Sequence, residues 1–264
     1  MPEPPELPEA ARPRWPAWYA PAGLGGAFGA LIVFGTPLLP VILIGTAGEA
    51  FAGVSLLVLL IAQDGMLMGT AVLFASFRKK PQLWHFGVRA TRFWPTIGLT
   101  VLACVLMLGF ELGYIELFGV DETNVEDLGK DNLVAGIAVS LAVIVLAPVS
   151  EEFFFRAFFY RALRNRFRVW SAALIDGLVF GLLHFTGLTS LAIIPVIAVF
   201  GVVLCLVYER TGSLFAVIAI HAVFNTIAML GVTPVVALVV GVLVLTGCLL
   251  AARRFGRAPA PLPV

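Results

Sequence analysis

The chain is divided into eight long apolar runs that are separated by short polar segments. A helix needs roughly 17–25 mostly apolar residues to cross the hydrocarbon core of a membrane, and every run falls near or above that length. The pattern therefore predicts an all-α, polytopic membrane protein of about eight transmembrane helices. The predicted spans are Leu24–Thr46, Ala50–Phe77, Pro95–Phe118, Asn132–Leu163, Val169–Phe185, Leu188–Tyr208, Ser213–Leu230 and Pro234–Ala252.

The polar segments between these runs predict the orientation of the chain. Basic residues collect in the cytoplasmic loops of membrane proteins. If the N-terminus is cytoplasmic, alternating crossings place 16 of the 17 Lys and Arg residues inside and leave only Lys130 outside. The acidic loop Asp121–Asp131 also falls outside. We therefore expect both termini to be cytoplasmic, with the protein in the cell membrane as a multi-pass protein.

Composition agrees with this class and excludes several others. The 264 residues are 60% hydrophobic and 12% charged, with a mean hydropathy of +1.01, far from the composition of a soluble domain. A net charge of +1 gives no reason to expect nucleic acid as a partner. Three cysteines stand singly in apolar runs, so a disulfide or a thiol nucleophile is not expected. We predict a disordered cytoplasmic tail over residues 1–23, a transmembrane domain over 24–252 and a second tail over 253–264.

Two adjacent carboxylates, Glu151 and Glu152, follow an apolar run that is predicted to lie in the membrane. Arg156 lies one helical turn beyond Glu152, so these two side chains share a helix face. Each charge at membrane depth costs about 2.5–3.5 kcal/mol on insertion scales, which makes a cluster a functional hypothesis. Pro148 removes a hydrogen bond from the helix just before the pair. A charged helix end at the cytoplasmic interface is the simpler alternative.

Further polar residues are predicted at a similar depth. His184 lies in an apolar run, and Asn225 follows His221 by four residues, so these last two share a face. At 1.5 Å per residue, Glu152 and His184 both lie about 20–25 Å from the turn between their helices. His221 and Asn225 lie about 12–18 Å from the same side. We expect all of them to surround one cavity, although each histidine alone is as easily explained by helix packing.

This set of residues suits the hydrolysis of a peptide bond. The reaction needs an activated water, a proton donor for the leaving amine and donors for the oxyanion. We expect Glu152 to pair with Arg156, which leaves Glu151 as the base. His184 can share the water or bind a metal, and His221 with Asn225 can hold an oxyanion. Zinc held by Glu151, His184 and His221 and a metal-free mechanism are both compatible with the sequence.

The three motifs resemble those of the CPBP intramembrane proteases, which include the CAAX prenyl endopeptidases and bacteriocin-processing or abortive-infection-like proteins. They are Glu-Glu-xxx-Arg at 151–156, Phe-xxx-His at 180–184 and His-xxx-Asn at 221–225. The protease-like region covers residues 132–230. The resemblance implies a multi-helix membrane fold, a metalloprotease label, Glu151 as the residue that activates water, and Glu152 and Arg156 as its structural support.

The sequence therefore predicts an intramembrane endopeptidase of the CAAX-protease type. Its partners are expected to be the lipid bilayer and a peptide or protein substrate in the membrane, with a prenylated C-terminus as one candidate. A non-catalytic immunity or regulatory protein on the same scaffold is the main alternative. A proton-coupled transporter that uses Glu151 and His184 as a relay is the third, although the chain lacks evident internal repeats. Asp176 is a candidate partner of His184 or a member of a structural ion pair.

Overall fold

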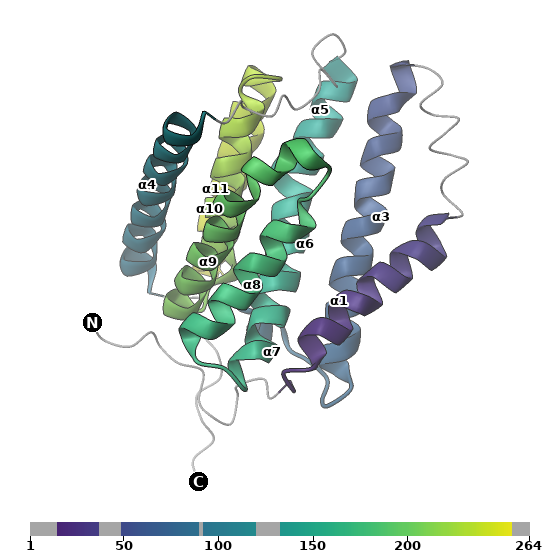
Figure 1. The fold of residues 1–264 in the computed structure, drawn as a ribbon, viewed down its shortest axis with the longest axis vertical. Helices are drawn as coiled ribbons and strands as arrows, with labels where there is room; N and C mark the ends of the chain where they lie inside the picture. The colour runs from purple at the N-terminus through teal and green to yellow at the C-terminus, as the bar shows by residue number, and fades with distance from the viewer. Residues whose placement is uncertain (1–14, 37–48, 90–91, 120–132, 255–264) are drawn as a thin grey trace.

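The computed structural model describes residues 15–36, 49–89, 92–119 and 133–254, and within these ranges it contains helices and no strand (Figure 1). The prediction of an all-α fold is confirmed for this part of the chain. The longer elements, in chain order, are α1 (Tyr19–Ala30) with η2 (Leu31–Gly35), α3 (Glu49–Ser76), α4 (Phe93–Phe118), α5 (Leu133–Leu141), η5 (Ala142–Leu146), α6 (Ala147–Glu152), η6 (Phe153–Tyr160), α7 (Arg161–Arg164), α8 (Val169–Leu183), α9 (Ile194–Thr211), α10 (Leu214–Met229) and α11 (Pro234–Arg254). Two short 3₁₀ turns, η4 (Leu83–Phe86) and η7 (Leu188–Ala192), connect them.

Among the described residues, five helices are long and apolar enough to cross a membrane. Three shorter apolar helices, Tyr19–Gly35, Val169–Leu183 and Leu214–Met229, overlap the remaining predicted spans. The chain is therefore a helical membrane protein, while eight crossings and cytoplasmic termini stay predictions. The five long segments are Leu57–Ser76, Phe93–Phe118, Leu133–Arg164, Ser190–Thr211 and Pro234–Arg254.

The start of the first helix differs from the prediction. We expected residues 1–23 to form a disordered tail, but α1 begins at Tyr19, and Trp15 and Tyr19 are each only 4% exposed. Trp15 packs against Phe86 and Phe158, with ring centroids 5.2 and 5.6 Å away. The tail prediction is therefore wrong for residues 15–23. It relied on the Pro- and Glu-rich composition of this segment, which does not reveal single aromatic residues that pack into the core. Residues 1–14 and 255–264 of the predicted tails lie outside the described residues.

One helical segment, Leu133–Arg164, runs through the centre of the fold and contains two π-helical stretches. The π-helical turns η5 and η6 flank the short α6, which carries both glutamates and has Pro148 in its first turn. The distortion expected from Pro148 is thus present on the N-terminal side of the glutamates. All eight residues of η6 are buried, so its phenylalanines form the core and do not face lipid.

The closest helix contact joins α8 to α9 and depends on glycine. A Cβ atom added at Gly177 would lie 2.6 Å from the carbonyl oxygen of Ala198, and one at Gly181 would lie 3.0 Å from the Ala198 nitrogen. Side chains larger than hydrogen cannot occupy these positions without separating the helices. The same spacing at Gly25 and Gly29 has no such role, because no described atom lies within 4 Å of a Cβ at either position.

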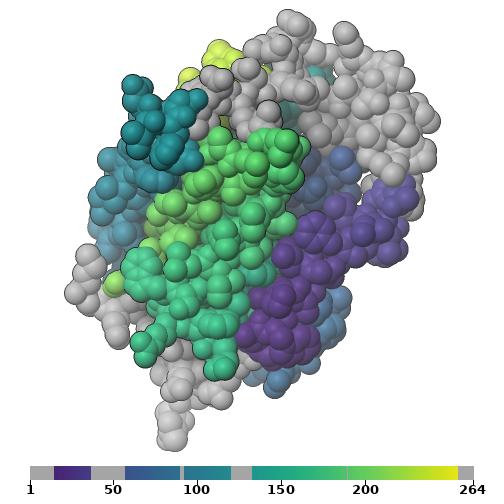
Figure 2. All heavy atoms as spheres, viewed as in Figure 1, coloured from purple at the N-terminus to yellow at the C-terminus, as the bar shows by residue number. Residues whose placement is uncertain are grey.

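The outer surface of the protein is strongly apolar. In α4 only Ala103 and Met107 are buried, and most of its leucines and valines are exposed. Exposed apolar area of this extent marks contact with a membrane or a partner. Figure 1 places α4 at one side of the bundle and α1 and α3 at the other, and Figure 2 shows α1 lying against the surface that contains α8. The charged residues of α6 and η6 lie between these two sides.

Candidate active site

Glu152 lies at the C-terminal end of α6 and has no exposed surface. Its Oε1 atom accepts hydrogen bonds from Nη1 of Arg156 at 2.9 Å and from Nδ1 of His221 at 2.7 Å. The pairing of Glu152 with Arg156 that the sequence predicts is confirmed. The contact with His221 was not predicted, because two residues 69 positions apart give no local signal.

His221 lies between the two glutamates. Because Nδ1 is hydrogen-bonded to a carboxylate, it carries the hydrogen, and Nε2 is the free nitrogen of the neutral ring. Nε2 lies 4.0 Å from Oε2 of Glu151. That oxygen is buried and has no hydrogen-bond partner among the described residues, although the Glu151 side chain as a whole is 20% exposed. A separation of 4.0 Å is too long for a direct hydrogen bond and suits a bridging water.

Arg156 is held on several sides. Its Nη2 donates to the carbonyl oxygen of Gly201 at 3.3 Å, and its Nε lies 3.8 Å from Oδ1 of Asp176. The guanidinium carbon also lies 4.3 Å from the centre of the Phe180 ring, within the range of a cation–π contact. Asp176 therefore belongs to the ion-pair cluster of Arg156, and its Oδ1 also accepts from Sγ of Cys205 at 3.1 Å.

His184 lies at the C-cap of α8 and is half-buried. Its Nδ1 atom is 2.8 Å from the carbonyl oxygen of Phe180. A carbonyl can only accept, so Nδ1 carries the hydrogen and Nε2 is free to accept one. The Phe180 ring lies next to both imidazoles, with its centre 4.8 Å from that of His184 and 6.0 Å from that of His221. His184 and His221 therefore both contact Phe180, while a catalytic role for His184 stays a prediction.

Asn225 contacts the distorted part of the central helix. Its Nδ2 atom donates to the carbonyl oxygen of Val143 at 2.6 Å. In η5 the N–H of Ala147 bonds to the Ala142 carbonyl, five residues back. The same register would pair the Val143 carbonyl with the nitrogen of Pro148, which has no hydrogen. Asn225 supplies the missing donor, and its amide retains a second hydrogen. The sequence analysis identified both residues but did not connect them.

The described residues do not fit a metal site. No three His, Cys, Asp or Glu side chains among them converge to hold an ion. Nδ1 of His221 is hydrogen-bonded to Glu152, and its Nε2 lies 4.0 Å from Oε2 of Glu151. Among the described residues no third ligand side chain converges on this pair. The metalloprotease label that the resemblance implied is therefore not supported by the described residues.

Fold and site together define a helical membrane protein that holds a glutamate–histidine–glutamate group inside its apolar core. Residues 133–227 match the family described as Type II CAAX prenyl endopeptidase Rce1-like, which is a peptidase family. The resemblance that the three motifs predict is confirmed over this segment, which contains every predicted site residue. No curated protein and no solved structure matches the chain.

Proposed function

We propose that the protein is an intramembrane endopeptidase of the cell membrane that hydrolyses a peptide bond with a water activated by Glu151. The observation that carries this proposal is the position of His221 between the two glutamates. Glu152, neutralised by Arg156, binds Nδ1 and directs Nε2 toward the buried oxygen of Glu151. A buried carboxylate without a hydrogen-bond partner, next to an imidazole nitrogen, is a suitable base for a water molecule.

In the first step, a water between Glu151 and His221 loses a proton to the carboxylate while its oxygen attacks the carbonyl carbon of the substrate. His184 offers a second acceptor nitrogen to the same water, since its Nδ1 is occupied by Phe180. The carbonyl π bond opens and its electrons move to the oxygen. The product of this step is a tetrahedral intermediate with one negative charge.

In the second step, the proton held by Glu151 passes through Nε2 of His221 to the leaving amine. Once protonated, Nε2 is a donor, and the remaining amide hydrogen of Asn225 is another. Both are candidates to stabilise the oxyanion. Removal of one oxyanion donor typically lowers the rate by about 10²–10³. The intermediate collapses, the carbon–nitrogen bond breaks, and the new carboxyl terminus forms. No step requires a metal ion.

The proposed substrate is a membrane-associated peptide that is cut near its C-terminus or within the membrane. A prenylated C-terminal peptide is the first candidate, because the matching family is described as prenyl endopeptidases.

The proposal is tested by comparing C-terminal peptides in membranes that contain the wild-type protein or Glu151→Gln. Peptides that end at a new C-terminus only with the wild type would identify the substrate. If both proteins give the same C-termini while a partner protein binds to each of them, a non-catalytic regulatory role would replace the protease. Proton flux into liposomes that is lost in Glu151→Gln would instead support the transporter.

A further inference from the structure

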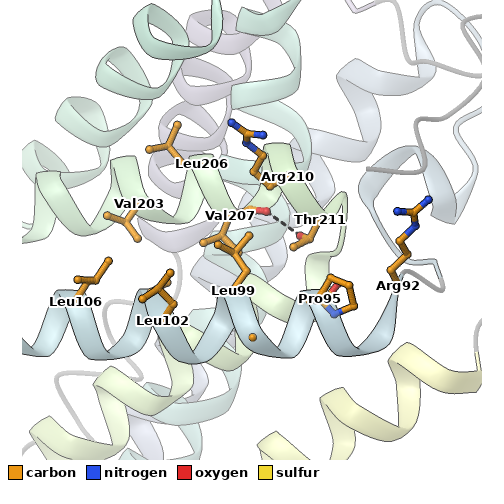
Figure 3. Close-up of a pocket in the computed structure, with 13 residues that line it drawn as sticks. Arg92, Pro95, Leu99, Leu102, Leu106, Val203, Leu206, Val207, Arg210 and Thr211 are labelled. Carbon is orange, nitrogen blue, oxygen red and sulfur yellow. Dashed lines mark hydrogen bonds between the residues drawn. The ribbon is translucent and has the colours of Figure 1, made fainter. Parts of the chain in front are cut away.

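A groove lies between α4 and α9, and its α4 wall belongs to the part of the chain that the family match does not cover. It encloses about 740 Å³, within the range of sites that bind small ligands. Apolar side chains line most of the groove, and Figure 3 shows them along the two facing helices. They are Leu99, Leu102 and Leu106 from α4 and Val203, Leu206 and Val207 from α9.

One end of this groove is positively charged. Arg92 and Arg210 line the end where Pro95 and Thr211 lie (Figure 3). Both arginines are exposed, and among the residues that the structure describes neither forms an ion pair with a carboxylate. A third cation is close, because the guanidinium of Arg253 lies 4.3 Å from the centre of the Phe93 ring, next to Arg92. No Asp or Glu is among the described residues that line the groove.

The dimensions of the groove match one leaflet of a bilayer. From Pro95 to Leu106 the α4 wall is about 16 Å long at 1.5 Å per residue. Half of a hydrocarbon core of about 30 Å is about 15 Å. The groove opens outward, since Leu102 and Leu106 are 53% and 63% exposed. A chain lying in it would run along the membrane normal, with its polar end at the arginines.

We propose that this groove is a binding site for an anionic phospholipid, with an acyl chain between α4 and α9 and the headgroup phosphate at Arg92 and Arg210. The apolar length selects the acyl chain, and the cationic end selects a negatively charged headgroup over a zwitterionic one. A second copy of this chain or an apolar peptide could pack against the apolar walls. Neither would necessarily bring a negative charge to Arg92 and Arg210, as an anionic lipid does. The inference is independent of the proposed peptidase activity.

The test measures binding of the first lipid to the purified protein by native mass spectrometry, with palmitoyl-oleoyl phosphatidylglycerol and with the matching phosphatidylcholine. Each basic residue near an anionic headgroup contributes about a fivefold preference, so the two arginines together should give about 25-fold. We expect Arg92→Gln with Arg210→Gln to remove this preference. The matched control, Arg166→Gln with Arg168→Gln, removes two exposed charges elsewhere and should keep it.

A second pair of variants tests the apolar part of the site. Gly98 lines the groove, and a Cβ there meets no described atom within 4 Å, so a side chain at this position can start into the groove, and Gly98→Trp is the variant chosen to fill it. Gly109→Trp on the same helix is the control, since Gly109 is equally unobstructed and does not line the groove. We expect Gly98→Trp to weaken the first site for both lipids at least about tenfold, or one unit of log Kd, and Gly109→Trp to leave it unchanged.

Several results would overturn the assignment. Equal affinity of the wild type for the two lipids would show that the site does not recognise an anionic headgroup. An equal loss of preference in the two double-arginine variants would indicate general surface charge. Equal lipid binding by Gly98→Trp and Gly109→Trp would place the lipid outside the groove. A dimer that Gly98→Trp dissociates and Gly109→Trp does not would assign the groove to a second copy of the chain.

Discussion

Nδ1 of His221 lies 2.7 Å from Oε1 of Glu152, the same oxygen that accepts a hydrogen bond from Arg156. The arginine stabilises the buried carboxylate, and the carboxylate fixes the orientation of the imidazole ring. Glu152 is thus more than the ion-pair partner that the sequence predicts, because it also decides which nitrogen of His221 faces Glu151. In the proposed mechanism Glu152 is a positioning residue, and Glu151 and His221 are the catalytic residues.

Glu151→Gln should abolish peptide cleavage while the protein remains folded and inserted. The amide keeps the size of the side chain but cannot take a proton from water. Loss of a general base typically lowers the rate by about 10²–10⁴. Cleavage of the substrate found by C-terminal proteomics measures the rate, and the thermal unfolding temperature measures folding. Glu116→Gln, an exposed carboxylate on α4, is the control. Cleavage by Glu151→Gln at the wild-type rate would reject the role of Glu151.

Arg156→Met should be strongly destabilising. It leaves the carboxylates of Glu152 and Asp176, both with 0% exposed side chains, without their cation. Breaking a buried ion pair by removing one partner costs about 3–5 kcal/mol. The free energy of unfolding in detergent is the measurement. Arg164→Met is the matched control, because its pair with Glu209 is 27% and 22% exposed, so water can solvate the remaining carboxylate and the loss should be smaller than for Arg156→Met. Equal losses in the two variants would contradict the burial argument.

The sequence predicts those parts of the structure that depend on nearby residues. Long apolar runs predict the helices, and a spacing of four predicts that Glu152 and Arg156 share a face. Pro148 predicts a distortion before the glutamates. Each of these follows from the hydrogen-bonding and length requirements of a helix in an apolar solvent.

Other contacts could not be predicted, because they join distant segments. Asp176 lies near Arg156 only because α8 packs against η6, and no local spacing encodes that distance. The contact of Asn225 with Val143 is a partial exception. A proline that removes a donor predicts a carbonyl in need of one, although not which side chain satisfies it. Trp15 was assigned to a tail for a similar reason, since composition averages over single aromatic anchors.

Gly177→Ala should destabilise the protein through the α8–α9 contact. The new methyl group would lie 2.6 Å from the carbonyl oxygen of Ala198, which is backbone and cannot rotate away. Overpacking of this kind costs about 1–3 kcal/mol. Gly109→Ala is the control, because no described atom lies within 4 Å of the added methyl, and alanine in a helix is favoured over glycine. A Gly177→Ala protein as stable as the control would show that the helices separate freely.

Chelators should leave the activity unchanged. The described residues contain no converging set of three metal ligands, and the proposed mechanism uses Glu151, His184 and His221 as bases and donors. Cleavage is measured after dialysis against a strong zinc chelator, and elemental analysis of the active protein gives the zinc content. Activity that is lost with the chelator and restored by one equivalent of zinc would contradict the proposed mechanism and require these side chains to rearrange.

Asn225→Ala should lower both stability and activity, for two separable reasons. The Val143 carbonyl, which is partly buried, loses its donor, and the loss of such a partner costs up to about 1–3 kcal/mol. The site also loses the second amide hydrogen proposed for the oxyanion. Pro148→Ala separates the two effects, because its new N–H can reach Val143 in the register that Ala147 already follows. Unfolding free energy and kcat are measured for Asn225→Ala alone and in combination with Pro148→Ala.

The double variant should regain most of the lost stability while kcat stays low. Stability returns because the carbonyl again has a donor, now from the backbone of the central helix. Activity does not return, since neither substitution restores a donor at the oxyanion. Full recovery of kcat would show that Asn225 acts only by holding the helix. A double variant as unstable as Asn225→Ala would instead show that the Val143 carbonyl is not the group that the amide satisfies.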